Sequence, residues 1–77
     1  MNSVVYDIRN GTIDIYLSEA ADRCEYVLYD SSDRVLSKGC LFGRIKKTCL
    51  YLGELNPGLY TMEVNGIRMD FMVGRAS

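Results

Sequence analysis

The sequence contains no histidine and no tryptophan, and Pro57 is its single proline. The absence of histidine excludes Ser-His and Cys-His nucleophile pairs and histidine-bearing zinc sites within one chain. No apolar run approaches the roughly 20 residues that a membrane-spanning helix requires. We therefore expect no enzymatic activity, no cofactor, no metal site, no small-molecule substrate and no membrane span.

Only three cysteines are present, Cys24, Cys40 and Cys49, and an odd number cannot pair completely within one molecule. The start Met1-Asn2-Ser3-Val4 lacks the charged segment and apolar run of a secretory signal. Both features favour synthesis in the cytoplasm, where thiols stay reduced and behave as small buried hydrophobes. An intermolecular disulfide and a three-thiolate metal site are the alternatives.

The chain of 77 residues predicts a single domain spanning residues 1–77. A domain this short buries only about 60% of the surface that its unfolded chain exposes. A core of this size rarely contributes more than about 3–5 kcal/mol, and many small domains gain further stability from a partner.

Apolar and polar residues alternate with period two in most segments, which is typical of half-buried strands. In 12–17, for example, Ile13, Ile15 and Leu17 alternate with polar neighbours. We predict strands at residues 4–9, 12–17, 25–30, 34–39, 45–52, 60–64 and 67–73. Seven short strands at spacings near ten residues indicate an all-β, antiparallel β-sandwich with immunoglobulin-like character.

Turn residues separate these segments. Asn10-Gly11 and Asn65-Gly66 predict type I′ hairpins, and Gly43-Arg44 predicts a type II′ hairpin. We also expect a polar loop at 18–22, an Asp- and Ser-capped turn at 31–33, a corner at 56–58 and a tail at 74–77.

Two segments carry a family resemblance. Residues 26–36 form a strand, an Asp-containing turn and a strand, and residues 50–60 carry Leu50, Leu52, Leu55, Pro57, Gly58, Leu59 and Tyr60. Both resemble the small C-terminal domains of Bacteroidetes secreted proteins, the type IX secretion sorting domains and related immunoglobulin-like families. The resemblance covers about two thirds of the chain and implies a β-sandwich, with a sorting or adhesin-type role as one possible function.

The net charge is −1, but the charges are segregated along the chain. Residues 1–33 carry seven acids and two bases, whereas residues 34–47 carry five bases and no acid. The bases are candidate interface residues: Arg34, Lys38, Arg44, Lys46 and Lys47. Such segregation suits head-to-tail docking or an anionic partner, and the protection of an edge strand is the alternative. A small nucleic-acid surface with Phe42 is disfavoured by the acidic pI near 5.2.

Tyrosines supply the second group of candidate interface residues. If Ile13, Ile15, Leu50 and Leu52 face the core, pleat alternation directs Tyr16 and Tyr51 outward. One of Tyr26 and Tyr29 must also face outward, because the two positions have opposite parity, and we take Tyr29 as the candidate. Exposed tyrosines are enriched at interfaces, although single exposed aromatics also occur on monomers.

These features predict a non-enzymatic structural or interaction module that docks onto a larger assembly or onto copies of itself. The sandwich resemblance makes a phage capsid accessory (decoration) protein the most specific form of this prediction, located in the virion after synthesis in the cytoplasm. A sorting or adhesin-type domain of a secreted protein is one alternative. A small nucleic-acid-binding or regulatory protein is the other.

Overall fold

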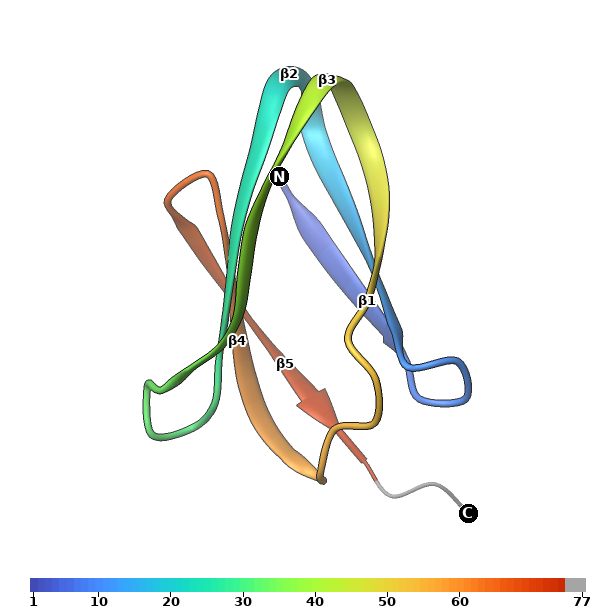
Figure 1. The fold of residues 1–77 in the computed structure, drawn as a ribbon, viewed down its shortest axis with the longest axis vertical. Helices are drawn as coiled ribbons and strands as arrows, with labels where there is room; N and C mark the ends of the chain where they lie inside the picture. Colours follow the sequence, from blue (N-terminus) through green and yellow to red (C-terminus); the bar gives the residue numbers. More distant parts are fainter. Residues whose placement is uncertain (75–77) are drawn as a thin grey trace.

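The computed structural model describes residues 1–74 as an all-β protein with five antiparallel strands. These are β1 (Ser3–Asp7), β2 (Thr12–Tyr29), β3 (Val35–Tyr51), β4 (Gly58–Val64) and β5 (Ile67–Val73). β2 pairs with β1, β3 and β4, and β5 pairs with β4 (Figure 1). Residues 75–77 of the predicted tail lie outside the described part of the chain. Among residues 1–74 there is no helix long and apolar enough to cross a membrane.

A bend in the β2–β3 hairpin gives the molecule its shape. Both strands turn at one end of the molecule and run back, so that Figure 1 shows two limbs that diverge from this bend. The first limb contains β1 with residues 12–16 of β2 and 47–51 of β3. The second contains residues 23–29 of β2 and 35–42 of β3, together with β4 and β5.

Unequal numbers of residues on the two strands produce the bend. Residues 17–20 of β2 lie opposite residue 46 alone, and residue 22 lies opposite residues 43 and 44. Extra residues of this kind bend the strand and increase its twist without ending the ladder. Gly43 has a φ of 119°, which glycine adopts more readily than other residues.

The bend corrects three predictions. The polar loop expected at 18–22 lies within β2, and the hairpin expected at Gly43-Arg44 lies within β3. Four of the predicted strands therefore merge into two long ones, and residues 1–74 contain five strands instead of seven. The predictions failed because polar and glycine residues that normally end a strand here occupy a bulged part of a continuous ladder.

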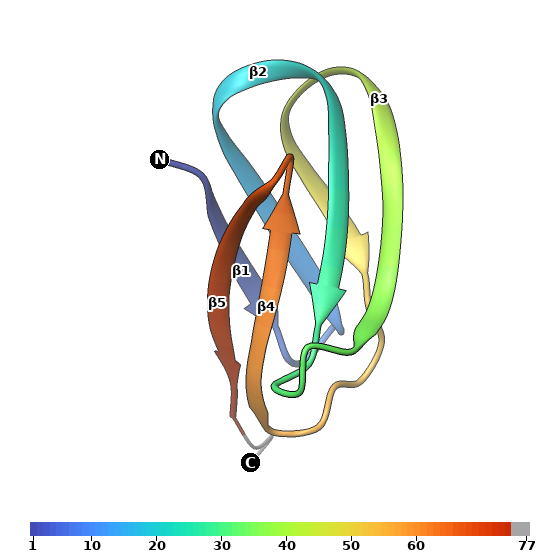
Figure 2. The same ribbon diagram turned by 90° about the vertical axis from the view of Figure 1, so that its left-hand side faces the viewer.

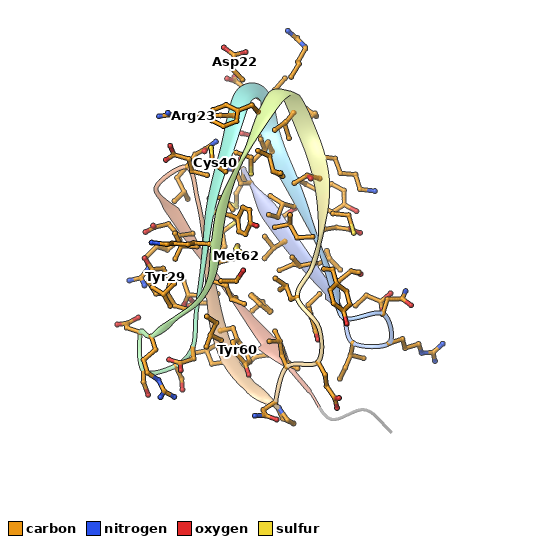
Figure 3. All side chains as sticks on the ribbon, viewed as in Figure 1. Asp22, Arg23, Tyr29, Cys40, Tyr60 and Met62 are labelled. Atoms are coloured by element: carbon orange, nitrogen blue, oxygen red, sulfur yellow. The ribbon has the colours of Figure 1, made fainter. Side chains whose placement is uncertain are left out.

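The core lies between the limbs and joins side chains from both. Ile13, Ile15 and Leu17 come from β2 in or next to the first limb, as their alternation predicts. Opposite them lie Cys24, Leu28, Tyr60, Met62, Val64 and Val73. These nine buried side chains form a small core, and Figure 3 shows Met62 between the limbs. Its size agrees with the expectation for a short chain.

The two Asn-Gly hairpins differ. Asn65-Gly66 is the predicted two-residue loop, with φ values of 49° and 84°. At Asn10-Gly11 the strands already end at Asp7 and Thr12, so the loop has four residues instead of the predicted two. The Asp7 carboxylate accepts hydrogen bonds from the backbone of Arg9 and Asn10, which stabilises the longer loop.

Asn65 also attaches the β4–β5 hairpin to β2. Its side-chain oxygen accepts a hydrogen bond from the Glu25 backbone N–H at 2.8 Å, and its side-chain nitrogen donates to the Arg23 carbonyl at 3.1 Å. Its backbone N–H donates to the Glu25 carbonyl at 2.8 Å. The Asn65 side chain therefore extends the β2–β4 pairing beyond the last backbone pair.

Tyr60 fixes the corner before β4. Its ring is buried, and its hydroxyl donates a 2.6 Å hydrogen bond to the Asn56 carbonyl four residues upstream. The ring lies 5.8 Å from that of Phe71, centroid to centroid, and Phe71 in turn lies 6.0 Å from Tyr6 of β1. This aromatic chain connects the corner, β5 and β1.

Replacing Tyr60 with Phe should lower the free energy of unfolding by about 1–2 kcal/mol, because the Asn56 carbonyl loses its partner in a partly buried site. Urea denaturation would measure the change. Tyr29→Phe is the matched control, because the Tyr29 hydroxyl makes no hydrogen bond within residues 1–74. Equal effects of the two substitutions would contradict a stabilising role for the Tyr60 hydroxyl.

Replacing Asn65 with Gly should destabilise the fold by about 1–2 kcal/mol, because the turn conformation is kept while two side-chain hydrogen bonds to β2 are lost. Thermal and urea unfolding would measure it. Asn10→Gly serves as the control, since it adds the same backbone freedom and removes only a local bond to Asp7. If Asn65→Gly lowered the free energy of unfolding no more than Asn10→Gly does, the Asn65 side chain would not attach the hairpin to β2.

Candidate interaction edge

One long edge of the sheet has no partner in the described part of the chain. β3 pairs with β2 along its length, and no other strand of residues 1–74 pairs with it. β1 and β5 lie together on the side of the molecule away from β3, as Figure 2 shows. The 17 residues of β3 therefore present a row of backbone donors and acceptors that β2 does not use.

β3 is also the most exposed long strand. None of its side chains is fully buried, although its inner side chains pack against the core. Several of its outward side chains are apolar: Val35, Leu36, Phe42 and Tyr51. Phe42 is 78% exposed and Tyr51 is 79% exposed. Large apolar side chains beside unpaired backbone groups are the features through which a sheet edge gains a further strand.

Four of the five candidate bases lie on β3: Lys38, Arg44, Lys46 and Lys47. Two of them contact the adjacent β2. The Lys46 ammonium donates to the Ser18 carbonyl at 2.7 Å, and the Lys47 ammonium lies 5.2 Å from the centre of the Tyr16 ring. Within residues 1–74 none of the four forms an ion pair. They therefore give the edge a net positive charge.

Arg34, the fifth candidate base, precedes β3 and belongs to a local turn. Its side chain bonds the Asp30 carboxylate at 2.9 Å, and the Asp30 carboxylate also accepts the backbone N–H groups of Ser32 and Arg34. These bonds lower the pKa of Asp30. The hydrogen bond from the Arg34 backbone has the largest effect. Arg34 thus contributes to the predicted capped turn.

The structure places the candidate tyrosines on two separate faces. Tyr16 and Tyr51 lie on the outer face of the first limb, as parity predicts, and Tyr29 lies on the outer side of the second limb (Figure 3). Tyr29 is half-buried because the Arg68 guanidinium stacks 4.5 Å from its ring centre. The candidates therefore do not form one patch, and β3 is the element that runs past both groups.

Tyr26 packs against the core. Of the two tyrosines with opposite parity, Tyr29 is therefore the one that faces outward. Its ring lies over Gly39 of β3, where an added Cβ would come within 2.5 Å of the Tyr26 hydroxyl oxygen. Only glycine leaves room for the ring at this position. The contact holds the Tyr26 ring against the inner face of the β3 backbone.

Leu36 and Arg68 were missed as interface residues, and Phe42 was considered only for a nucleic-acid surface. Leu36 and Phe42 flank Lys38 and Cys40 on the outer face of β3, and all four are exposed. The period-two spacing of positions 36, 38, 40 and 42 could have indicated this stripe. Arg68 was missed because its contact with Tyr29 spans nearly 40 residues of sequence and depends on strand pairing.

The cysteines are free and two have altered acidity. Burial raises the pKa of the Cys24 thiol, and a hydrogen bond to the Asp14 carboxylate raises that of Cys49. A raised pKa keeps a thiol protonated and lowers its nucleophilicity at neutral pH. Among residues 1–74 no three His, Cys, Asp or Glu side chains come together in a metal-binding cluster.

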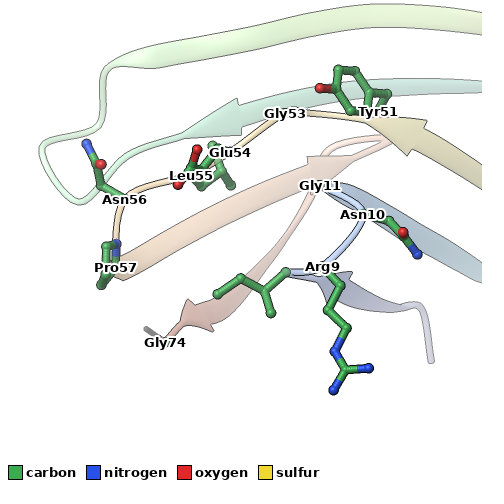
Figure 4. Close-up of a pocket in the computed structure, with 11 residues that line it drawn as sticks. Arg9, Asn10, Gly11, Tyr51, Gly53, Glu54, Leu55, Asn56, Pro57 and Gly74 are labelled. Atoms are coloured by element: carbon green, nitrogen blue, oxygen red, sulfur yellow. The ribbon is translucent and has the colours of Figure 1, made fainter. Parts of the chain in front are cut away.

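A hollow lies at the end of the molecule away from the bend. It is lined by the β1–β2 loop, including Arg9 and Gly11, and by Tyr51 and the segment 53–57 (Figure 4). Backbone groups meet here, since the Gly11 carbonyl accepts hydrogen bonds from the backbone of Leu52 and Gly53. Gly74, the last described residue, borders the hollow. We assign no ligand to this hollow.

Replacing Asp14 with Asn should increase the rate at which iodoacetamide alkylates Cys49 by roughly twofold to fivefold, because loss of the carboxylate lowers the thiol pKa and raises the thiolate fraction. Mass spectrometry of the peptides would give the rate. Cys40, which is also exposed, is the internal reference in both proteins. An unchanged ratio of the two rates would contradict the Asp14 contact.

No protein-family model and no curated protein matches the sequence. The resemblance of residues 26–36 and 50–60 to sorting-type domains therefore stays a prediction. The β3 edge and the two outer faces are the features from which a function is inferred.

Proposed function

We propose that this chain is a non-enzymatic interaction module that docks onto a larger protein assembly through β3. The observation that carries the proposal is the unpaired edge of this strand, which presents Leu36, Phe42 and Tyr51 together with basic side chains. Backbone groups at such an edge gain direct hydrogen bonds when a protein segment pairs with them. Exposed aromatic side chains supply contact area beside these bonds.

The small core supports the same proposal. Nine side chains are buried in the described part of the chain, and a domain of this length derives limited stability from so few. A partner that binds only the folded state adds stability in proportion to its concentration and affinity. Docking therefore suits this domain, because its small core contributes limited stability and a partner at its free edge would add to it.

The finer fold assignment belongs to the same proposal. The hydrogen bond from the Tyr60 hydroxyl to the Asn56 carbonyl has the geometry of a tyrosine corner, in which a tyrosine near the start of a strand bonds backbone a few residues upstream. Such corners characterise immunoglobulin-like sandwiches. The corner and the two facing limbs support an immunoglobulin-like relationship in which the long hairpin supplies strands to both layers.

A phage capsid accessory protein is the specific assembly role that we propose, on the strength of the resemblance and the docking edge. A nucleic-acid partner is less well supported, because acidic side chains of β2 lie beside the basic ones of β3. Glu25 pairs in register with Cys40, two residues from Lys38, and Asp14 pairs with Cys49, two residues from Lys47. Phosphate binding would have to overcome this adjacent negative charge.

Photo-crosslinking in the native cells would test docking. A photoreactive amino acid is placed at position 36, 42 or 51 of β3, and the adducts are separated by mass and identified. We expect discrete adducts of one protein species, because a specific partner covers these positions in a fixed orientation.

Position 59 supplies the matched control, because Leu59 is also apolar and is 44% exposed but lies on β4. Adducts that are equally strong at position 59, or a diffuse mixture from every position, would contradict docking through β3. Identification of a capsid protein as the adduct would support the specific role, and a different assembly would replace it.

A further inference from the structure

The two halves of the β3 edge differ in protection. Edge strands avoid unwanted pairing by means of lysines, bulges and strong twist. Residues 43–51 carry Arg44, Lys46 and Lys47 and include the bend, whereas residues 35–42 carry Lys38 as their single charge. The first half of the edge is therefore the less protected one.

This half is also regular. Positions 37–42 pair with positions 28–23 of β2 in one uninterrupted register. Six residues in a strand span about 20 Å, enough for several backbone hydrogen bonds to an added segment. An incoming strand thus meets a regular ladder from residue 37 to residue 42. The register shifts at residue 36, which is an extra residue on β3, and again at the bend, where pairing must end.

The outer face of residues 35–42 carries a defined set of side chains. Leu36, Lys38, Cys40 and Phe42 alternate with the inner positions Ser37, Gly39 and Leu41. Glu25, Val27, Lys38 and Cys40 also line a hollow beside Gly39, together with Tyr26. A strand added here has apolar neighbours at both ends of its outer face and an ammonium group between them.

Charge selects the occupant. Lys38 is the single charge of residues 35–42, and residues 43–51 add three bases and no acid, so the β3 of a second copy would bring positive charge and no carboxylate to Lys38. Like charges directly opposite one another on adjacent strands are destabilising, and opposite charges are stabilising. The Glu25 carboxylate on the adjacent β2 is already paired with Arg23 at 3.2 Å. Lys38 forms no ion pair within residues 1–74 and is available to a carboxylate of an incoming segment.

We infer that residues 35–42 of β3 bind an extended acidic segment of the partner protein as an added antiparallel strand. The segment places Asp or Glu opposite Lys38 and apolar side chains opposite Leu36 and Phe42, so that its outward residues read apolar, small, acidic, apolar at every second position. This inference rests on the proposed function and names the recognised chemistry.

A synthetic peptide tests the inference. The probe is an acetylated and amidated seven-residue peptide, Val-Val-Thr-Val-Glu-Thr-Val, whose glutamate falls opposite Lys38 when the first valine lies opposite Phe42. Titration into the ¹⁵N-labelled 77-residue chain is followed by NMR. We expect shifts of backbone amides confined to residues 35–42 and their neighbours on β2, with slower hydrogen exchange along β3.

Three matched reagents make the result specific. Two peptides are N-methylated at alternate residues, one at the odd positions and the other at the even positions. Only the peptide in which the methylated amides are those that would donate to β3 should lose binding. Lys38→Glu should weaken binding about threefold to tenfold, and a peptide with Lys in place of Glu should recover it. Lys47→Glu makes the same charge change on the first limb and should leave the local shifts at 35–42 in place.

Strand addition would be overturned by absence of binding at millimolar peptide, by equal binding of both N-methylated versions, or by shifts centred on another strand. Self-association of the purified chain through residues 35–42, seen by sedimentation, would also overturn it in favour of a second copy. Specific crosslinks from β3 in cells combined with a failed peptide titration would retain docking and refute this mode of recognition. The absence of both specific crosslinks and peptide binding would refute the proposed function as well.

Discussion

The backbone pairing between β2 and β3 continues through the bend, and the arrangement of the remaining elements depends on this continuity. Because residues 17–20 of β2 lie opposite a single residue of β3, the hairpin folds over without losing its ladder. The two halves of β2 then face each other across the core, with β1 paired to one half and β4 to the other. The bulged hairpin thus supplies residues to both walls of the core.

The same continuity creates the free edge. β1 and β4 pair with the other side of β2 at residues 12–16 and 26–29, so β3 has β2 as its one partner strand among residues 1–74 and lies at the edge of the sheet. Its outer backbone groups face water, and its bulge and basic side chains protect mainly the part from residue 43 onward. The bent hairpin therefore both encloses the core and supplies the candidate interface, since the outer edge of β3 has no partner among residues 1–74.

Local sequence predicted the parts of the fold that depend on alternation and turn chemistry. The inward positions Ile13, Ile15, Met62 and Val64 follow from period two, and the loop at Asn65-Gly66 follows from the tolerance of both residues for positive φ. The continuity of β2 and β3 could not be predicted in this way. Polar residues at 18–22 are typical of a loop, and only the pairing partner across the bulge keeps them in a strand.

The candidate site shows the same division. Sequence by itself determined that the chain is all-β, that Tyr16 and Tyr51 point away from the core, and that bases concentrate between residues 34 and 47, because pleat parity and charge are local properties. Tertiary structure alone decided that Tyr26 turns inward over Gly39, that Arg68 covers Tyr29, and that β3 has no second partner among residues 1–74. These depend on which strands lie side by side, and strand pairing is a long-range choice that no single segment encodes.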